Sequence, residues 1–112
     1  MKRSMLMVMV LFLMASLALT ACGQGEQEAA GPFKAAFVYI GPPGDLGWTY
    51  EHDQGRKMLE EELGDQVETT YIENVEEGPD SARVMRQYAQ EGYDMIFATS
   101  FGYMDHMYEV AE

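Results

Sequence analysis

The chain has 112 residues, a formal net charge of −12 and a single cysteine, Cys22. So large an excess of acidic side chains disfavours a nucleic-acid partner, because the surface would repel the phosphate backbone. One cysteine excludes an internal disulfide, and His52 and His106 lack the spacing of zinc ligands, so we expect neither a metal nor another cofactor. The acidic residues are scattered along the sequence, which is typical of a solubilising surface.

Residues 1–21 have the three parts of a secretory signal peptide. Two cations follow Met1, an apolar stretch covers residues 5–19, and small side chains stand before Cys22. The apolar stretch is shorter than the roughly 20 residues that a membrane-spanning helix needs. We therefore expect residues 1–21 to direct export and to be removed.

Residues 19–22, Leu-Thr-Ala-Cys, resemble the bacterial lipobox, in which the cysteine receives a diacylglyceryl group and becomes the first residue of the mature protein. The alternative is an ordinary cleaved signal with an incidental cysteine, but an exported protein with one unpaired thiol is unusual. The resemblance implies that Cys22 anchors the protein to the extracytoplasmic side of a cell membrane, because several acyl chains form a durable anchor. Residues 22–32 are rich in Gly, Gln and Glu and predict a flexible tether.

The remaining residues, 33–112, alternate between strand and helix patterns. Apolar or β-branched runs predict the strands, apolar residues at helical spacing predict the helices, and Gly64 and Gly92 are typical helix stops. We expect strands at 33–40, 67–72 and 95–98, and helices from 45 or 49 to 63, from the turn at 76–81 to 92, and from 103 onward. On the first helix, Asp53 is expected to be a surface acid.

This order predicts an α/β fold with a doubly wound parallel sheet and right-handed crossovers. Three strands would leave the sheet with bare edges, and the last helical pattern still runs at Glu112 without a stop signal. We therefore expect the chain to be a part of a longer protein that continues with more strands and a second lobe.

In a parallel sheet, ligands bind beyond the carboxyl ends of the strands, which places the loops at 41–48, 74–80 and 99–105 at the candidate site. The first loop carries three glycines, Asp45 and the only tryptophan, Trp48. An indole offers a flat face on which a ring can stack, and a carboxylate accepts hydrogen bonds from ligand N–H or O–H groups. Spacing alone is equally compatible with a Trp48 that packs into the core and an Asp45 that only caps the helix.

The third loop combines the hydroxyl of Ser100 with the aromatic ring of Phe101. A ring facing Trp48 would complete a clamp on a planar ligand, with core packing again the alternative. An enzyme is not expected, because Ser100 and His106 form the only candidate pair of nucleophile and base and have no third partner. Both histidines are expected to be exposed helix residues.

Three segments resemble the basic membrane protein family of ABC-transporter solute-binding lipoproteins, which includes the PnrA-like purine nucleoside receptors. They are Lys34-Ala-Ala-Phe-Val-Tyr-Ile-Gly41, Gly44-Asp-Leu-Gly-Trp-Thr-Tyr-Glu-His-Asp-Gln-Gly55 and Ile96-Phe-Ala-Thr-Ser-Phe-Gly-Tyr-Met-Asp105. The resemblance implies a partial N-terminal lobe of a two-lobed type 1 periplasmic-binding-protein fold. It also implies a small-molecule ligand, such as a purine nucleoside or base, and an ABC permease as partner.

Within the family pattern, Asp45 matches an acid of the first loop, and Phe101 matches the aromatic residue that follows the later strand. Trp48 stands where the family has Phe, and Thr49 stands where it has Asn, so the aromatic platform is kept while an amide is lost. A nucleoside, a free base or another small ring all remain open. The expected ligand contacts are Asp45, Trp48, Thr49, Ser100 and Phe101.

Other ligand contacts are expected from a second lobe, so these residues alone should bind weakly. A membrane-tethered ligand sensor for a signalling receptor is the alternative function on the same fold.

Overall fold

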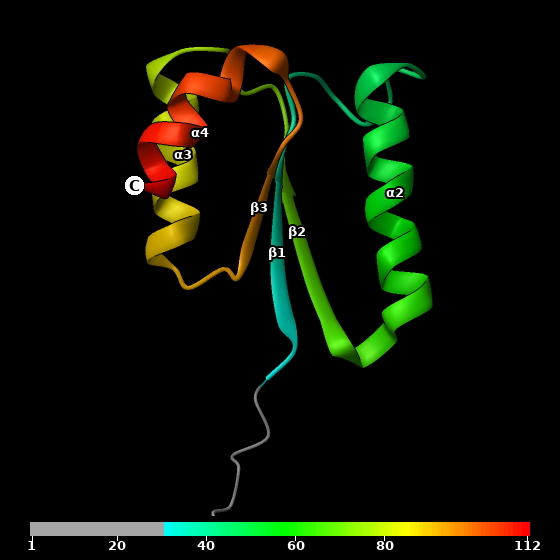
Figure 1. Ribbon diagram of the computed structural model, residues 1–112. Helices are drawn as coiled ribbons and strands as arrows, with labels where there is room; N and C mark the ends of the chain where they lie inside the picture. The colour runs from blue at the N-terminus through cyan, green and yellow to red at the C-terminus, as the bar shows by residue number, and fades with distance from the viewer. Residues whose placement is uncertain (1–30) are drawn as a thin grey trace, which may run out of the picture. The chain divides into compact units, whose positions relative to one another are not determined.

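The computed structural model describes residues 31–112 (Figure 1). The predicted signal peptide, the lipidation site Cys22 and the tether up to residue 30 lie outside the described residues and stay predictions. Within residues 31–112, no helix combines the length and the apolar character that a membrane crossing requires.

Strands and helices alternate along the described chain. Their bounds are β1 Phe33–Val38, α2 Trp48–Leu63, β2 Val67–Ile72, α3 Pro79–Gln90, β3 Met95–Ala98 and α4 Met104–Ala111. Short 3₁₀ turns at Gly64–Gln66 and Phe101–Tyr103 precede β2 and α4. The predicted order is confirmed, but the first strand is two residues shorter than predicted. It ends at Val38 because both neighbouring strands end there, with Val38 level with Ile72 on one side and Ala98 on the other.

The helix ends agree with the local sequence signals. α3 begins at Pro79, whose fixed φ suits the first helical position. α2 ends before Gly64, which has a left-handed φ of 51° and donates its N–H to the carbonyl of Glu60.

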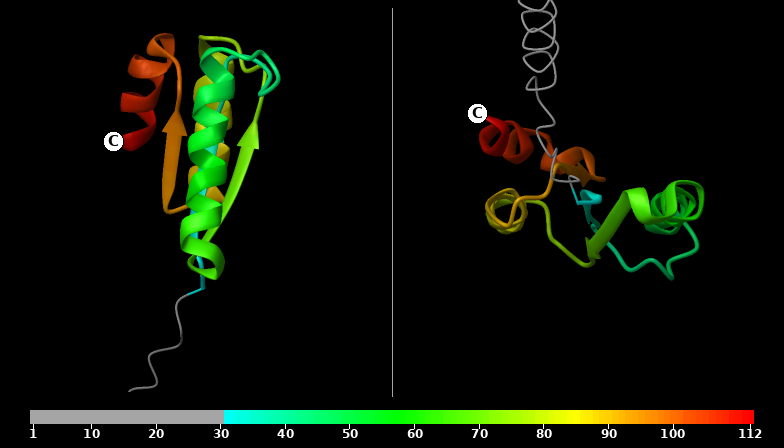
Figure 2. Two further views of the ribbon diagram at one scale, coloured as in Figure 1. Left: turned by 90° about the vertical axis from the view of Figure 1, so that its right-hand side faces the viewer. Right: turned by 90° about the horizontal axis from the view of Figure 1, so that it is seen from below.

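The three strands form a parallel sheet in the order β2-β1-β3, with β1 in the centre. Helix α2 covers one face of the sheet, and α3 and α4 cover the other (Figures 1 and 2). This arrangement confirms the predicted α/β class and the doubly wound path of the chain.

Alternate residues of β1 and of the segment that follows it build a core on each face of the sheet. Toward α3 and α4, Val38 packs in an apolar cluster with Val75, Val84, Met85 and Tyr103. Toward α2, a smaller cluster follows the other positions, Ala35, Phe37 and Tyr39, with Leu59 of the helix against it.

Polar contacts supplement the smaller core under α2. Asp53 and Arg56 are buried, with Arg56 Nε 2.8 Å from Asp53 Oδ1 and Lys57 Nζ 2.8 Å from Asp53 Oδ2. Arg56 Nη1 also donates to Glu60 and to Thr69 of β2, each at 2.9 Å. The prediction of Asp53 as a surface acid is wrong, because its carboxylate faces the sheet and binds two cations.

Burial alone would raise the pKa of Asp53, but hydrogen bonds from Lys57 and Arg56 outweigh it and hold that pKa below its ordinary value. The network therefore keeps Asp53 ionised at neutral pH. The side chains of Arg56 and Glu60 tie α2 to β2, which fixes the helix that begins with Trp48.

Candidate ligand-binding site at the strand ends

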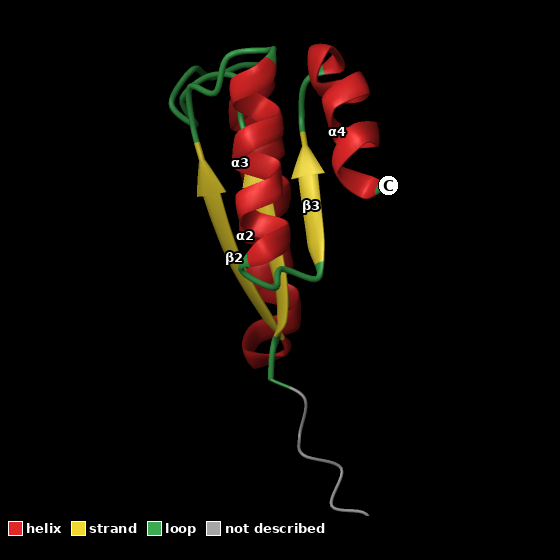
Figure 3. Cartoon of the chain, turned by 90° about the vertical axis from the view of Figure 1, so that its left-hand side faces the viewer, coloured by secondary structure: helices red, strands yellow, loops and turns green. Residues whose placement is uncertain are grey.

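Three loops meet beyond the carboxyl ends of the parallel strands (Figure 3). We call them the Trp48 loop (residues 41–48), the Glu77 loop (73–78) and the Phe101 loop (99–103). The chain leaves β1 toward α2 on one face and leaves β3 toward α4 on the other. The ends of β1 and β3 thus form the topological switch point where open α/β sheets bind ligands.

Asp45 organises the Trp48 loop. Its Oδ1 accepts hydrogen bonds from the backbone N–H groups of Gly47 at 2.8 Å and Tyr50 at 3.0 Å, and its Oδ2 accepts one from Thr49 at 3.1 Å. The N–H of Gly47 is the main cause of a lowered pKa of Asp45. Asp45 therefore caps α2, as one of the two interpretations of the sequence had it, and both its oxygens already accept hydrogen bonds.

Trp48 lies at the surface, with 61% of the residue exposed. Its Nε1–H donates to the carbonyl of Thr99 at 2.5 Å, which joins the Trp48 loop to the Phe101 loop. The ring of His52 packs against the indole with centroids 4.8 Å apart, and His52 Nδ1 lies 2.8 Å from the carbonyl of Trp48. Because a carbonyl only accepts, this Nδ1 carries the hydrogen. The alternative of a Trp48 packed into the core does not hold, and His52 is half-buried rather than exposed.

Thr49 is fully buried beneath the Trp48 loop. A Cβ added to Gly41 would lie 3.4 Å from Thr49 Oγ1, so the loop backbone passes directly over this hydroxyl. The hydroxyl has no hydrogen-bond partner among the described residues. A ligand would reach Thr49 only if the loop moved.

Phe101 stands out from the opposite loop, with 85% of the residue exposed. The residues on either side of it bind the same acceptor, Glu77 Oε1, through Ser100 Oγ at 2.5 Å and Gly102 N at 3.0 Å. The hydroxyl of Thr99 donates to the carbonyl of Val38 at 3.0 Å, which fixes the start of the loop to β1. The hydroxyl of Ser100 is therefore already bound within the protein.

Tyr103 fixes the buried side of the Phe101 loop. The residue is fully buried, and its hydroxyl donates to the carbonyl of Val75 in the Glu77 loop at 2.5 Å. Burial, with the carboxylate of Glu77 as a second cause, raises the pKa of Tyr103 to about 12. The Glu77 loop thus contacts the Phe101 loop through two separate hydrogen-bonding groups.

Glu77 is the residue that sequence reasoning missed. The segment at 76–81 predicted only a turn and a helix start, and Glu77 is one of two adjacent acids there. Its position at a strand end is a signal that it belongs near the site, but no pattern in the sequence shows which acid reaches the Phe101 loop.

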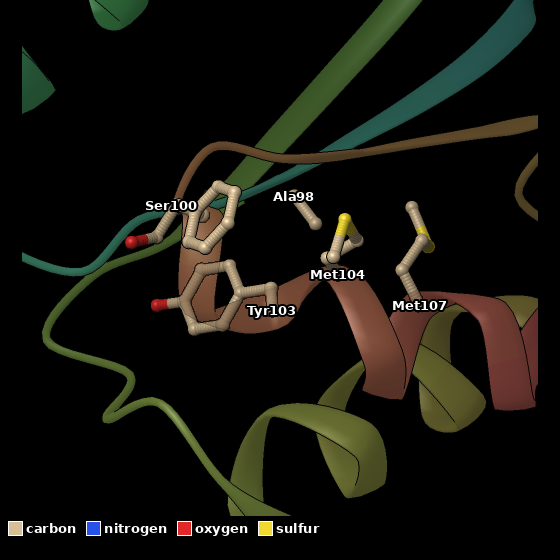
Figure 4. Close-up of a pocket in the computed structure, with 6 residues that line it drawn as sticks. Ala98, Ser100, Tyr103, Met104 and Met107 are labelled. Atoms are coloured by element: carbon tan, nitrogen blue, oxygen red, sulfur yellow. The ribbon is translucent and has the colours of Figure 1, made fainter.

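A pocket of about 330 Å³ lies between the end of β3 and α4, and Phe101 is one of its lining residues (Figure 4). Ala98, Met104 and Met107 give it an apolar lining. The hydroxyls of Ser100 and Tyr103 point away from the two methionines and toward the Glu77 loop. The pocket therefore offers few polar groups to recognise a ligand, and Trp48 is not part of its lining.

Ser100 and His106, the candidate pair of nucleophile and base, each lie near a different acidic residue. The hydroxyl of Ser100 is bound to Glu77, whereas His106 Nδ1 lies 3.8 Å from Glu109 on its own helix. Within residues 31–112, no three His, Cys, Asp or Glu side chains gather in a way that would hold a metal ion.

Residues 33–112 match a family model described as "ABC transporter substrate-binding protein PnrA-like". Over 88 residues the chain is 56% identical to a purine-binding protein of Brucella abortus, an alignment that covers 79% of this chain and 25% of the relative. Over 93 residues it is 50% identical to a putative ABC transporter glucose-binding protein of Haloferax volcanii, with 83% of this chain and 23% of the relative covered. The chain therefore spans about a quarter of the length of these relatives.

Among solved structures, an ABC transporter solute-binding protein of Conexibacter woesei superimposes with a TM-score of 0.64. The superposition covers 70% of this chain and 25% of that protein, at 17% sequence identity. This likeness supports the fold, of which this chain covers a part.

Proposed function

The chain belongs to the family of PnrA-like ABC transporter substrate-binding proteins, and we propose that it supplies one side of a purine-binding site for an ABC importer. The family and the fold are those of substrate-binding proteins rather than enzymes. The purine ligand, the permease partner and the membrane anchor are parts of the proposal.

The purine assignment rests on a difference between the aromatic rings and the carboxylates at the strand ends. The rings are exposed, whereas the carboxylates accept hydrogen bonds within the protein. Trp48 and Phe101 are 61% and 85% exposed, at the ends of the adjacent strands β1 and β3. The carboxylate of Asp45 accepts three hydrogen bonds from its own loop, and that of Glu77 accepts two from the Phe101 loop. Open aromatic faces suit a flat heterocycle, for which stacking contributes about 1–3 kcal/mol per base.

A sugar is the competing ligand, because the relative from Haloferax volcanii is named as a putative glucose-binding protein. A hexose carries many hydroxyls, each of which needs a polar partner when it is buried. Both carboxylate oxygens of Asp45 and one of Glu77 already accept hydrogen bonds within the protein, which favours the purine named in the Brucella relative over glucose.

The proposed binding is weak, because two rings and the loop backbone are the contacts that this part of the chain offers. We expect a Kd of about 0.1–1 mM for adenine or adenosine. A thermal-shift screen of the full chain against adenine, adenosine, glucose and amino acids tests the assignment. A ligand at ten times its Kd stabilises the folded state by about 1.4 kcal/mol, which is several degrees in Tm for a domain of this size.

A rise in Tm with adenine or adenosine and none with glucose is the expected result. A rise with glucose alone would replace the purine by a sugar. If no purine or sugar shifts Tm at 10 mM, the ligand site is not formed by these two loops.

The membrane anchor is proposed from the lipobox-like residues 19–22. Expression in a bacterial host, followed by mass spectrometry of the N-terminal peptide, should show a diacylglyceryl group on Cys22 and loss of residues 1–21. Cys22→Ala should release the protein from the membrane fraction. A mature protein that has an unmodified Cys22 and is absent from the membrane fraction would contradict the anchor. The ligand proposal would not be affected.

A further inference from the structure

We propose that Glu77 is a positioning residue that holds Phe101 at the ligand-facing end of the strands. The ligand part of this inference rests on the proposed function, whereas the contact itself does not. Glu77 lies 24 residues before Phe101 in the sequence, yet its Oε1 accepts hydrogen bonds from both Ser100 and Gly102. One carboxylate oxygen thus binds the side-chain hydroxyl before the exposed ring and the backbone N–H after it.

Packing gives Phe101 little support of its own. With 85% of the residue exposed, few contacts restrain its ring, and the turn at Phe101–Tyr103 is a single turn of 3₁₀ helix. Short 3₁₀ segments have poor hydrogen-bond geometry, so outside contacts determine how well such a turn is fixed. Glu77 provides those contacts on the solvent side, while Tyr103 binds the carbonyl of Val75 on the buried side.

The backbone conformation of the Glu77 loop positions the carboxylate of Glu77. Asn74 has a left-handed φ of 57°, and Gly78 has a φ of 137° directly after Glu77. Asparagine and glycine are the residues that tolerate such conformations. These two residues shape the loop from which the side chain of Glu77 reaches the Phe101 loop before α3 begins.

Gly102 leaves the space that the contact needs. A Cβ at this position would overlap the carboxylate of Glu77, and the backbone of Gly102 does not adopt a left-handed φ. Alanine is therefore compatible with the backbone at Gly102 but would push the carboxylate of Glu77 away. Gly102→Ala consequently breaks the contact without changing Glu77 itself.

The consequence for binding is preorganisation. A ring that is already fixed loses less conformational freedom when a ligand stacks on it, so affinity rises without a new ligand contact. Glu77 should therefore affect purine affinity through Phe101 alone, and its effect should vanish when the ring is removed.

The experiment uses ¹⁵N-labelled full chain and four single variants: Glu77→Ala, Glu77→Gln, Gly102→Ala and the control Glu76→Ala, which removes the neighbouring exposed acid. Hydrogen exchange of the Gly102 amide reports the contact, and titration with adenosine reports affinity. We expect Glu77→Ala and Gly102→Ala to lose the protection of the backbone amide at position 102 and to bind adenosine about fivefold more weakly, equivalent to about 1 kcal/mol. Glu77→Gln keeps an acceptor oxygen and should stay near the wild type, as should Glu76→Ala.

A double variant separates positioning from general loss of structure. In a Phe101→Ala background, Glu77→Ala should change adenosine affinity by less than a factor of about two, because contacts that act through one residue are not additive. An equal fivefold loss in that background would overturn the inference and make Glu77 an independent contact.

The two proposals fail differently. If the wild type binds no purine, the proposed function fails, and exchange of the Gly102 amide alone decides whether Glu77 holds the loop. If Glu77→Ala leaves both the Gly102 exchange rate and the adenosine affinity unchanged, the positioning role is wrong even though the purine site stands.

Discussion

The Trp48 loop and the Phe101 loop present similar exposed rings but are held in opposite ways. The Trp48 loop is organised from within, because Asp45 binds backbone N–H groups only two to five residues further along the chain. The Phe101 loop is organised from outside, by Glu77, whose partners lie 23 and 25 residues away. A local cap needs no folded sheet around it, whereas the contact of Glu77 exists only once three strands have brought their ends together.

The largest expected effect is a loss of stability when the buried network between α2 and the sheet is broken. This network holds α2, and with it the Trp48 loop, against the sheet. Arg56→Met leaves the buried carboxylate of Asp53 without its buried partner and should lower the free energy of unfolding by about 3 kcal/mol. Lys57→Met is the matched control, since Lys57 binds the same carboxylate but its side chain is 55% exposed, and it should cost at most about 1 kcal/mol. Urea unfolding measures both, and equal losses would mean that the buried position of Arg56 is unimportant.

The next largest expected effect is a loss of adenosine affinity when the ring of Trp48 is removed. Trp48→Ala removes the larger aromatic face and the bond from Nε1–H to Thr99, so we expect adenosine affinity to fall about thirtyfold. The residue is mostly exposed, so Tm should change by only a few degrees. Calorimetric titration with thermal unfolding of the same sample separates the two effects. An affinity equal to that of the wild type would remove Trp48 from the site.

A smaller loss of adenosine affinity is expected when Phe101→Ala removes the ring of the other loop. Phenylalanine offers a smaller face than indole and makes no hydrogen bond, so adenosine affinity should fall about tenfold. Tm should not fall, because so little of Phe101 is buried. Tyr108→Ala is a suitable control, as it removes an exposed aromatic ring from α4 outside the three loops. An equal loss of affinity in both variants would contradict a specific role for Phe101.

The smallest expected effect is a pH dependence of stability that arises from Tyr103 in the Phe101 loop. The pKa of Tyr103 is raised to about 12 by burial and by the carboxylate of Glu77, whereas an unfolded tyrosine ionises near 10.0. The folded state thus keeps its proton longer, and the stability that Tyr103 contributes is complete below pH 10 and lost as pH rises toward 12.

Thermal unfolding between pH 8 and pH 11 should show a steeper loss for the wild type than for Tyr103→Phe. We expect a difference of about 1 kcal/mol at pH 11. Tyr39, whose pKa is also raised to about 12, contributes equally to both proteins. Parallel curves would show that folding does not raise the pKa of Tyr103.

The fold was predictable because its signals are local. Each strand is a run of mostly apolar or β-branched residues, and Pro79 and Gly64 mark helix ends by their own backbone preferences. The position of the loops at the strand ends then follows from the parallel order alone. Asp45 was correctly named as a possible cap, because a cap and its partners are neighbours in sequence.

The contacts across the loops were not predictable from the sequence. Nothing near Glu77 shows that it reaches Ser100, and nothing near Trp48 shows that its indole binds the carbonyl of Thr99. Asp53 was misjudged for the same reason, because its burial depends on how α2 packs on the sheet. The five expected ligand contacts stay predictions. Among them Trp48 and Phe101 are exposed rings, whereas Asp45 and Ser100 are hydrogen-bonded within the protein and Thr49 is buried.

The central claim is that a purine stacks on these rings, and the single tryptophan allows a direct test. In a ¹⁵N–¹H correlation spectrum, the indole N–H of Trp48 gives one side-chain signal that no other residue can produce. We predict that adenosine shifts this signal and the amide signal of Gly102 along saturable curves with the same Kd, while glucose shifts neither. An indole signal that stays in place at 10 mM adenosine, or that follows glucose equally well, would contradict the account.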